Sequence, residues 1–306
     1  MTDSAASTIR LGTRGSRLAM VQAEAAAAAL RAAAPARPVE LVSVATAGDR
    51  DSDRPVAELG GRGSFTSELE RHLVAGEIDA AVHSAKDLPV AMDPAATIGA
   101  VLPRGDVRDA LVSRDGIDLD ALPTGSLVGT GSPRRRAQLR AVRPDLRFTD
   151  LRGNVETRLA KLDAGVCDAA VLAAAGLQRL GCLDARSRLI DVERMVPAPG
   201  QGIIAIQCRR DDAAMLELLG AVREESAAIE LAAERLVMAG LGVGCHTPLG
   251  AVARRTGGEV SLLVWFQRPA DRVPRVARGA AAVDRMDSLA ADLCRTLVAP
   301  MDTNRD

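Results

Sequence analysis

The sequence predicts two α/β halves of similar build, followed by a smaller α+β domain. Short apolar runs alternate with helical segments up to about Arg223, a pattern typical of α/β domains. The pattern then changes to a helix at Glu225–Ala239, strands near Gly250–Arg254 and Val260–Trp265, and a last helix near Met286–Leu297. A chain of 306 residues is long enough for two or three domains.

The first half is predicted to hold three strands and two helices. Strands are expected at Ile9–Leu11, Val39–Val44 and Ala80–Val82. An alanine-rich helix follows the Gly12–Ser16 turn, extends to about Ala34 and stops at Pro35. Its expected buried face carries Leu18, Val21, Ala25 and Ala28. A second helix at Ser67–Val74 is expected to turn Leu69, Leu73 and Val74 inward.

Two segments of the first half recur in the second half. Gly129–Ser132 precedes an arginine-rich helix much as Gly12–Ser16 precedes its helix, and Gly165–Val171 resembles Gly76–Val82. We therefore expect two halves with mainly parallel sheets. Ligands of such sheets bind at the carboxyl ends of the strands, so a cleft between the halves is expected to hold the site.

Composition excludes several classes of function. Lys and Arg number 39 against 40 Asp and Glu, and this net charge of −1 argues against a nucleic-acid or anionic-membrane partner. No apolar run reaches the length of about 18 residues that marks a membrane span. The N-terminal segment has no signal-peptide pattern, so a cytoplasmic location is expected.

The cysteines and the acidic residues predict no metal site. Five cysteines at wide, irregular spacing indicate reduced thiols without a disulfide framework or a CxxC metal motif. Asp49, Asp51 and Asp53 lack the glycine and terminal glutamate of a calcium loop, so a solvated loop is the favoured interpretation. They belong to Thr46–Phe65, a glycine-rich segment that we interpret as a mobile lid.

Both glycine turns have two interpretations. Small residues and hydroxyls at a helix N-terminus can cap the helix, or they can bind an anion through unpaired backbone N–H groups. Arg14, Arg17, Arg134 and Arg135 lie beside the two turns and favour the anion site.

Asp87 and Cys245 are the two candidate reactive groups. Asp87 follows the third strand beside Lys86, and the two could form a surface ion pair or place a carboxylic acid in the cleft. Cys245 lies among Gly242, Gly244 and Pro248, which predict a turn that exposes its thiol. A lone cysteine can equally be structural.

In combination, seven segments resemble the porphobilinogen deaminase (hydroxymethylbilane synthase) family, and they occur in that family's order. The seven segments are Gly12–Ser16, Gly60–Phe65, His83–Pro89, Gly129–Arg135, Leu151–Val155, Pro197–Gly202 and Gly244–Gly250. The resemblance covers the chain from about Ile9 to Trp265. It implies two domains like type II periplasmic binding proteins and a third α+β domain that carries the attachment cysteine. The implied boundaries are 1–102 with 203–220, 103–202, and 221–306.

The resemblance also implies an activity, a transferase reaction of tetrapyrrole biosynthesis. Cys245 would hold a dipyrromethane cofactor through a thioether, and four porphobilinogen molecules would be added head to tail with loss of ammonia. Hydrolysis would then release hydroxymethylbilane, which passes to uroporphyrinogen-III synthase. Asp87 matches the family's catalytic aspartate and would protonate the departing amine. A monomeric, cytoplasmic enzyme is expected.

Each pyrrole carries an acetate and a propionate, which arginines and short polar side chains would bind. The residues implied for the cofactor are Cys245, Ser16, Lys86, Asp87, Thr130, Ser132, Arg134, Arg135, Arg152 and Gly153. Those implied for the substrate are Arg14, Ser16, Arg152, Arg158, Arg179, Phe65 and Gln201.

Two other functions are weighed against this one. A non-enzymatic carboxylate-binding protein of the periplasmic type would explain two α/β halves, but it predicts an export signal and leaves Cys245 without a role. A ligand-sensing regulator of nucleic acid would need a helix-turn-helix segment with a basic face, and none is evident.

Overall fold

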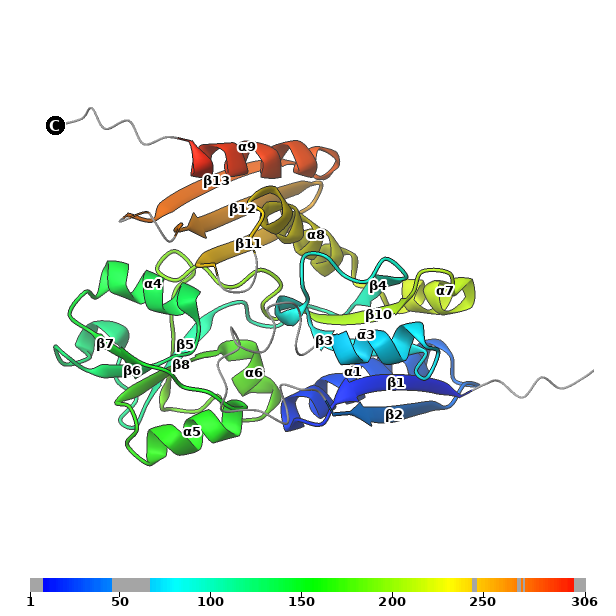
Figure 1. Ribbon diagram of the computed structural model, residues 1–306, viewed down its shortest axis with the longest axis horizontal. Coiled ribbons are helices and arrows are strands. Elements are labelled where there is room, and N and C mark those ends of the chain that lie inside the picture. Colours follow the sequence, from blue (N-terminus) through cyan, green and yellow to red (C-terminus); the bar gives the residue numbers. More distant parts are fainter. Residues whose placement is uncertain (1–7, 46–66, 244–246, 269–270, 272, 300–306) are drawn as a thin grey trace, which may run out of the picture.

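A computed structural model describes residues 8–45, 67–243, 247–268, 271 and 273–299 of the chain. Figure 1 shows three β-sheets with their helices: two α/β domains side by side, and a C-terminal domain that lies across both. The predicted fold class, two α/β domains plus an α+β domain, is confirmed. The predicted lid, Thr46–Phe65, lies outside the described residues.

The first domain is built on a five-stranded sheet of order β2-β1-β3-β10-β4. Its strands are β1 (Ile9–Arg14), β2 (Val39–Val44), β3 (Ala80–Ser84), β4 (Ala96–Val101) and β10 (Ile204–Arg209). Helices α1 (Arg17–Ala33) and α7 (Ala213–Val222) pack with the core that contains Leu11 and Ile206, whereas α3 (Ser67–Val74) packs with a separate cluster around Ile78.

The second domain repeats this arrangement in a sheet of order β7-β6-β8-β5-β9. Its strands are β5 (Asp109–Ser113), β6 (Leu127–Gly129), β7 (Arg147–Thr149), β8 (Ala169–Ala173) and β9 (Ser187–Leu189). Its helices are α4 (Pro133–Val142), α5 (Val155–Asp163) and α6 (Ala174–Arg179). The recurring segments Gly76–Val82 and Gly165–Val171 lead into β3 and β8, which are the central strands of the two sheets. The predicted similarity of the halves is therefore confirmed.

The expectation of mainly parallel sheets is confirmed, although each sheet contains one strand that runs against the other four. In the first sheet β1 pairs in parallel with β2 and β3, but β10 pairs antiparallel with β3 and β4. The second sheet has the same division, with β5 antiparallel to β8 and β9. The cause is the chain path: it enters the second domain through β5 and returns to the first through β10. Each of these strands is inserted beside the central strand of its sheet.

The C-terminal domain contains one strand more than the sequence predicted. Helices α8 (Glu225–Gly240) and α9 (Met286–Val298) pack against an antiparallel sheet of β11 (Leu249–Thr256), β12 (Glu259–Phe266) and β13 (Arg275–Ala282). The missed strand β13 consists mainly of alanine, arginine and glycine, so no apolar run marks it.

Two expectations about helix faces are also wrong. Helix α1 buries Gln22, Ala23, Ala26, Ala27 and Leu30, whereas Ala25 and Ala28 are exposed. With alanine at most positions, hydrophobic periodicity cannot choose a face, and the larger Leu30 decides the packing instead. In α3, Leu69 and Leu73 are buried as expected, but Val74 at the end of the helix is 41% exposed.

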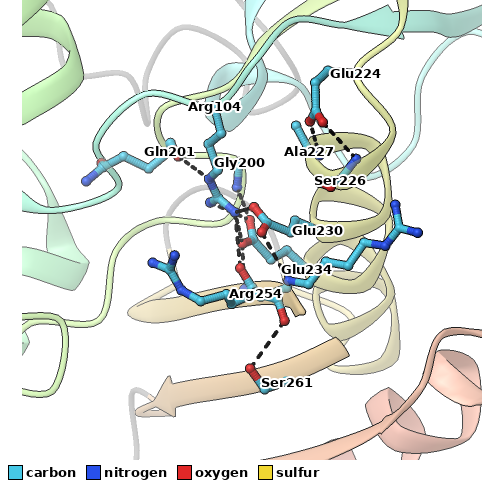
Figure 2. Close-up of polar contacts among 12 residues, drawn as sticks. Arg104, Gly200, Gln201, Glu224, Ser226, Ala227, Glu230, Glu234, Arg254 and Ser261 are labelled. Atoms are coloured by element: carbon cyan, nitrogen blue, oxygen red, sulfur yellow. Dashed lines mark hydrogen bonds and ion pairs between the residues drawn. The ribbon is translucent and has the colours of Figure 1, made fainter. Parts of the chain in front are cut away.

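A buried ion pair holds both crossings between the α/β domains against the C-terminal domain (Figure 2). Arg104 lies between β4 and β5, where the chain first crosses between domains, and its guanidinium contacts Glu234 of α8 at 2.8 and 3.2 Å. Glu234 is fully buried and also accepts hydrogen bonds from the backbone N–H groups of Gly200 and Ala253, at 2.5 and 2.7 Å. Gly200 belongs to the second crossing, between β9 and β10.

Two further contacts complete this network. Arg104 donates from Nη1 to Glu230 at 3.0 Å and from Nε to the backbone carbonyl of Gln201 at 3.0 Å. Burial raises the pKa of Glu234, and the Arg104 guanidinium and the two backbone amides oppose that rise. Both crossings are therefore held against α8 by one glutamate and one arginine.

We expect Glu234→Gln to lower the free energy of unfolding by about 3–5 kcal/mol, because it leaves a buried guanidinium without its main counter-charge. Urea unfolding followed by circular dichroism measures the change. Glu225→Gln is the matched control on the same helix, since Glu225 is 61% exposed and lies 3.4 Å from Arg223. We expect the control to change stability by less than about 0.5 kcal/mol. Equal stability of the two variants would contradict this role of Glu234.

Candidate active site

Both glycine turns cap helices, as one of the two interpretations predicted. Ser16 Oγ accepts a hydrogen bond from the Ala19 N–H at 3.3 Å at the start of α1. Ser132 Oγ accepts from the Arg135 N–H at 3.4 Å at the start of α4, beside the buried Thr130. These bonds satisfy one backbone N–H in each first turn, and capping leaves others for an anion.

Glycine is required at two positions near these turns. A Cβ at Gly129, where β6 ends, would lie 2.8 Å from Cys167 Sγ and 2.9 Å from Leu151 Cδ2. Gly153 has a φ of 106° just before α5, and a Cβ there would lie 2.7 Å from the Thr157 side chain. Close packing at Gly129, and close packing together with a left-handed backbone at Gly153, therefore exclude residues with a side chain at these two positions.

Lys86 and Asp87 lie on a short 3-10 helix, Ala85–Asp87, directly after β3. A backbone hydrogen bond ties this turn to the residue before β10, because the Ala85 N–H donates to the Ile203 carbonyl at 3.0 Å. Gly200 approaches it so closely that a Cβ there would lie 2.9 Å from Lys86 N. The carboxylate of Asp87 is exposed and Lys86 is half-buried. Burial lowers the pKa of Lys86 to about 8, with Arg135 and Arg134 acting in the same direction and Asp87 and Asp109 against it.

Arg134 and Arg135 are buried and share one counter-ion, Asp109. Arg135 donates from Nε and Nη2 to Asp109 Oδ1 at 3.1 and 2.8 Å, and Arg134 Nη1 lies 2.9 Å from Asp109 Oδ2. Burial alone would raise the pKa of Asp109, but the two arginines hold it well below its usual value. Asp109 is the first residue of β5 and is fully buried.

Arg158 extends this group of cations. Its Nε donates to the Gly153 carbonyl at 2.8 Å. Burial lowers the pKa of Arg158 to about 10; Arg135 and Arg152 lower it further, and Asp87 opposes them. Arg158 thus interacts electrostatically with Asp87 of the first domain and with Arg135 and Arg152 of its own domain. The structure therefore brings the predicted acid together with predicted carboxylate-binding residues from the opposite domain.

Arg14 and Arg179 are two further predicted carboxylate-binding residues. Arg14 is the last residue of β1, and it lowers the pKa of His83, which burial already lowers to about 4. His83 is therefore neutral at pH 7 and is not a proton donor there. Arg179, at the end of α6, donates from Nη2 to the Gly202 carbonyl at 2.6 Å and so contacts the second crossing.

Three predicted site residues need separate comment. Cys245 and Phe65 lie outside the described residues. Gln201 is 1% exposed, and its Nε2 already donates to the Val107 carbonyl at 2.8 Å and to Asp109 Oδ1 at 2.9 Å.

The sequence reasoning missed Asp109 and the Arg104–Glu234 pair. For Asp109 a signal existed, since an acidic residue that opens the apolar run Ala110–Val112 needs a buried partner.

An excess of positive charge defines the chemistry of this group of residues. Four cations, Lys86, Arg134, Arg135 and Arg158, interact electrostatically with two carboxylates, Asp87 and Asp109. Such a site favours a ligand with several carboxylates. Among the described residues, no cluster of His, Cys, Asp and Glu suited to a metal ion is present. The described part of the chain also contains no helix long and apolar enough to cross a membrane.

Comparison with known proteins gives consistent matches along the chain. The family model described as porphobilinogen deaminase, dipyromethane cofactor binding domain, matches residues 9–217, and the model of the C-terminal domain of the same enzyme matches residues 228–280. The porphobilinogen deaminase of Roseiflexus sp. (strain RS-1) is 49% identical over 255 residues, which is 83% of this chain and 84% of that protein. That of Xanthomonas euvesicatoria pv. vesicatoria (strain 85-10) is 51% identical over 251 residues, 82% of each.

Solved structures give a weaker match. The methionine-binding protein MetQ has a TM-score of 0.45 at 16% identity and covers 72% of this chain and 92% of its own, a likeness too low to support an argument. The family models and the sequence relatives are sufficient by themselves: this chain belongs to the porphobilinogen deaminase family.

Proposed function

We propose that this chain is a hydroxymethylbilane synthase, a transferase of tetrapyrrole biosynthesis. It joins four porphobilinogen molecules head to tail with loss of ammonia and releases hydroxymethylbilane by hydrolysis. The observation that supports this most directly is the position of Asp87, an exposed carboxylate among Lys86, Arg135 and Arg158. An acid surrounded by carboxylate-binding groups suits a substrate that carries both carboxylates and an amine.

The cleft also suits a dipyrromethane cofactor, which we propose is attached through Cys245. A dipyrromethane carries four carboxylates, and the excess of buried cations over carboxylates described above would neutralise part of that charge. Arg134, Arg135 and Lys86 would hold these groups together with carboxylates of the porphobilinogen that joins them, with Ser132 and Thr130 nearby. When bound, the cofactor supplies the free α-carbon on which the chain is extended.

This chain's own residues would perform three tasks. Asp87 Oδ would protonate the departing amine of the substrate and stabilise positive charge on the pyrrole nitrogens. Arg14, Arg152, Arg158 and Arg179 would bind the acetate and propionate groups of the substrate. The caps at Ser16 and Ser132 would orient the backbone N–H groups of α1 and α4 toward anions.

We also propose the finer organisation that the resemblance implied. The division into 1–102 with 203–220, 103–202 and 221–306 is supported by β10 and α7, which pack with the first sheet. A monomeric, cytoplasmic enzyme that passes its product to uroporphyrinogen-III synthase completes the proposal.

The intact mass of the purified protein tests the attachment site. We expect an excess mass of one dipyrromethane that disappears in Cys245→Ala, because only the thiolate can form the thioether. Cys182→Ala is the control and should keep the adduct, since Cys182 is a half-buried free thiol at the end of α6. A wild-type protein that carries no adduct and acquires none from porphobilinogen would refute the proposed function.

Asp87→Asn should keep the adduct but lower kcat by about 10²–10⁴-fold, because the cleft retains its cations and loses its acid. Steady-state assays with porphobilinogen, combined with intact mass, measure both properties. Asp93→Asn provides the comparison, since Asp93 is also exposed and its Oδ1 only accepts from the Ala95 N–H. Normal turnover of Asp87→Asn would show that another group supplies the proton.

The pH dependence of KM tests the contribution of Lys86. Its lowered pKa of about 8 means that the ammonium is charged at pH 7 and loses its charge as the pH rises through 8. Carboxylate binding should therefore weaken, and KM rise, between pH 7 and pH 9. Lys86→Arg should flatten this rise, because a guanidinium stays charged throughout. Identical pH profiles of KM for the two proteins would exclude Lys86 from carboxylate binding.

A further inference from the structure

Asp109 contacts Arg134 and Arg135, two arginines at the N-terminal end of α4, where positive charge is unfavourable. Arg134 and Arg135 occupy the first turn of α4, where the helix dipole repels cations, and both are at least 94% buried. Buried like charges side by side are costly unless a counter-charge is present. Among the described residues, Asp109 is the carboxylate that contacts both.

The contacts of Asp109 help to fix each guanidinium. Arginine has five N–H donors, and Arg135 uses three in its two bonds to Asp109 Oδ1 and one to the Val171 carbonyl at 2.9 Å. Arg134 Nη1 donates to the Val196 carbonyl at 2.7 Å and lies beside Asp109 Oδ2. These contacts fix both guanidinium groups; Arg135 donates from all three of its nitrogens but uses only three of its five N–H donors.

Those remaining donors belong to the cationic group of the cleft. Arg134 and Arg135 both affect Lys86 electrostatically, and Arg135 affects Arg158. A guanidinium that protein contacts hold in place, and that keeps further N–H donors, is a preorganised receptor for a carboxylate, because little side-chain freedom is lost on binding.

Gln201 belongs to the same arrangement and not to the surface of the cleft. Its side-chain amide donates to Asp109 Oδ1, and its backbone carbonyl accepts from Arg104 Nε. Gln201 thus connects the Asp109 cluster with the Arg104–Glu234 pair that binds both crossings to α8. Its 1% exposure leaves it no surface for direct contact with substrate.

We propose that Asp109 is a positioning residue that aims the free donors of Arg134 and Arg135 at the carboxylates of the pyrrole chain, and that Gln201 acts through Asp109. The inference rests on the proposed function, since it takes the ligand carboxylates from there. It assigns to Gln201 a supporting role in place of the substrate contact that the sequence implied.

Asp109→Asn tests the inference, because asparagine keeps the shape and removes the charge. We expect KM for porphobilinogen to rise about tenfold or more with kcat little changed, since carboxylate binding is lost equally in ground and transition states. The apoprotein should also acquire its dipyrromethane more slowly, as followed by intact mass. A purely structural role would instead lower the melting temperature and the active fraction while KM stayed constant, and that result would overturn the proposal.

Asp120→Asn is the matched control. Asp120 also receives two guanidinium hydrogen bonds, from Arg194 at 2.6 and 2.7 Å, but it is 70% exposed and lies on the short 3-10 helix Leu119–Ala121. We expect this variant to keep wild-type KM, kcat and rate of cofactor acquisition. Equal effects of Asp109→Asn and Asp120→Asn would contradict a special role for the buried aspartate.

Gln201→Met provides a second test if Asp109→Asn does not fold. It removes the amide donor while the ion pairs remain, and KM should rise by a few fold, the size expected for one hydrogen bond to a charged group. Wild-type KM in Gln201→Met would overturn the role given to Gln201. Where both single variants fold, the double variant adds a further comparison, because Gln201→Met should have little additional effect without the Asp109 charge. Effects that multiply would show that Gln201 acts independently of Asp109 and would overturn the role given to it.

The two proposals can fail separately. A wild-type protein without dipyrromethane and without turnover of porphobilinogen would refute the proposed function. A wild-type protein with both, together with an Asp109→Asn variant of unchanged KM and unchanged cofactor acquisition, would refute only the positioning role.

Discussion

The Arg104–Glu234 ion pair is the contact on which the relative placement of the three domains depends. A chain that leaves one α/β domain and later returns to it has two crossings, and crossings are the natural hinges of such a fold. Here Arg104 lies in the first crossing, and Gly200 and Gln201 lie in the second. Glu234 pairs with Arg104 of the first crossing and accepts a hydrogen bond from the Gly200 N–H of the second. One polar network therefore links α8 with both crossings.

Positive charge is the second constraint, and it explains why the cleft contains so many internal contacts. The cations of the cleft include two arginines in the first turn of a helix and a half-buried lysine whose pKa falls to about 8. Such an arrangement is stable only when carbonyl groups and carboxylates balance part of the charge. Asp109 and the carbonyls of Val171 and Val196 do so, and the charge that remains is what a polycarboxylate ligand would meet.

The sequence predicted the fold class and the elements that apolar runs and turn residues mark clearly, but it did not predict β4, β5, β7 or β9. The bounds of α3 agree with the expected ones, and α1 ends just before Pro35. The pairing direction of β5 and β10 could not be predicted in the same way, since it depends on where the chain crosses between domains. The strand β13 was missed because its alanines and glycines carry no hydrophobic period.

The candidate site was predictable only in part, for a physical reason. Motifs identify residue types, so they could single out Asp87, Lys86 and the arginines as candidates. Whether an arginine points to ligand or to protein depends on its partners, and the partner Asp109 lies 25 residues before Arg134 in the chain. Gln201 shows the same limit: its motif predicted a substrate contact, whereas its side chain is buried against Asp109.

These two clusters are connected, and the connection gives the C-terminal domain a role in shaping the cleft. Arg104 pairs with Glu234 and donates a hydrogen bond to the Gln201 backbone carbonyl, and the Gln201 side-chain amide donates to Asp109. Asp109 in turn fixes Arg134 and Arg135. Helix α8, which carries Glu234, ends at Gly240, shortly before Cys245. A displacement of α8 would therefore disturb Arg134 and Arg135 through this chain of contacts, which couples the C-terminal domain to residues proposed to bind carboxylates.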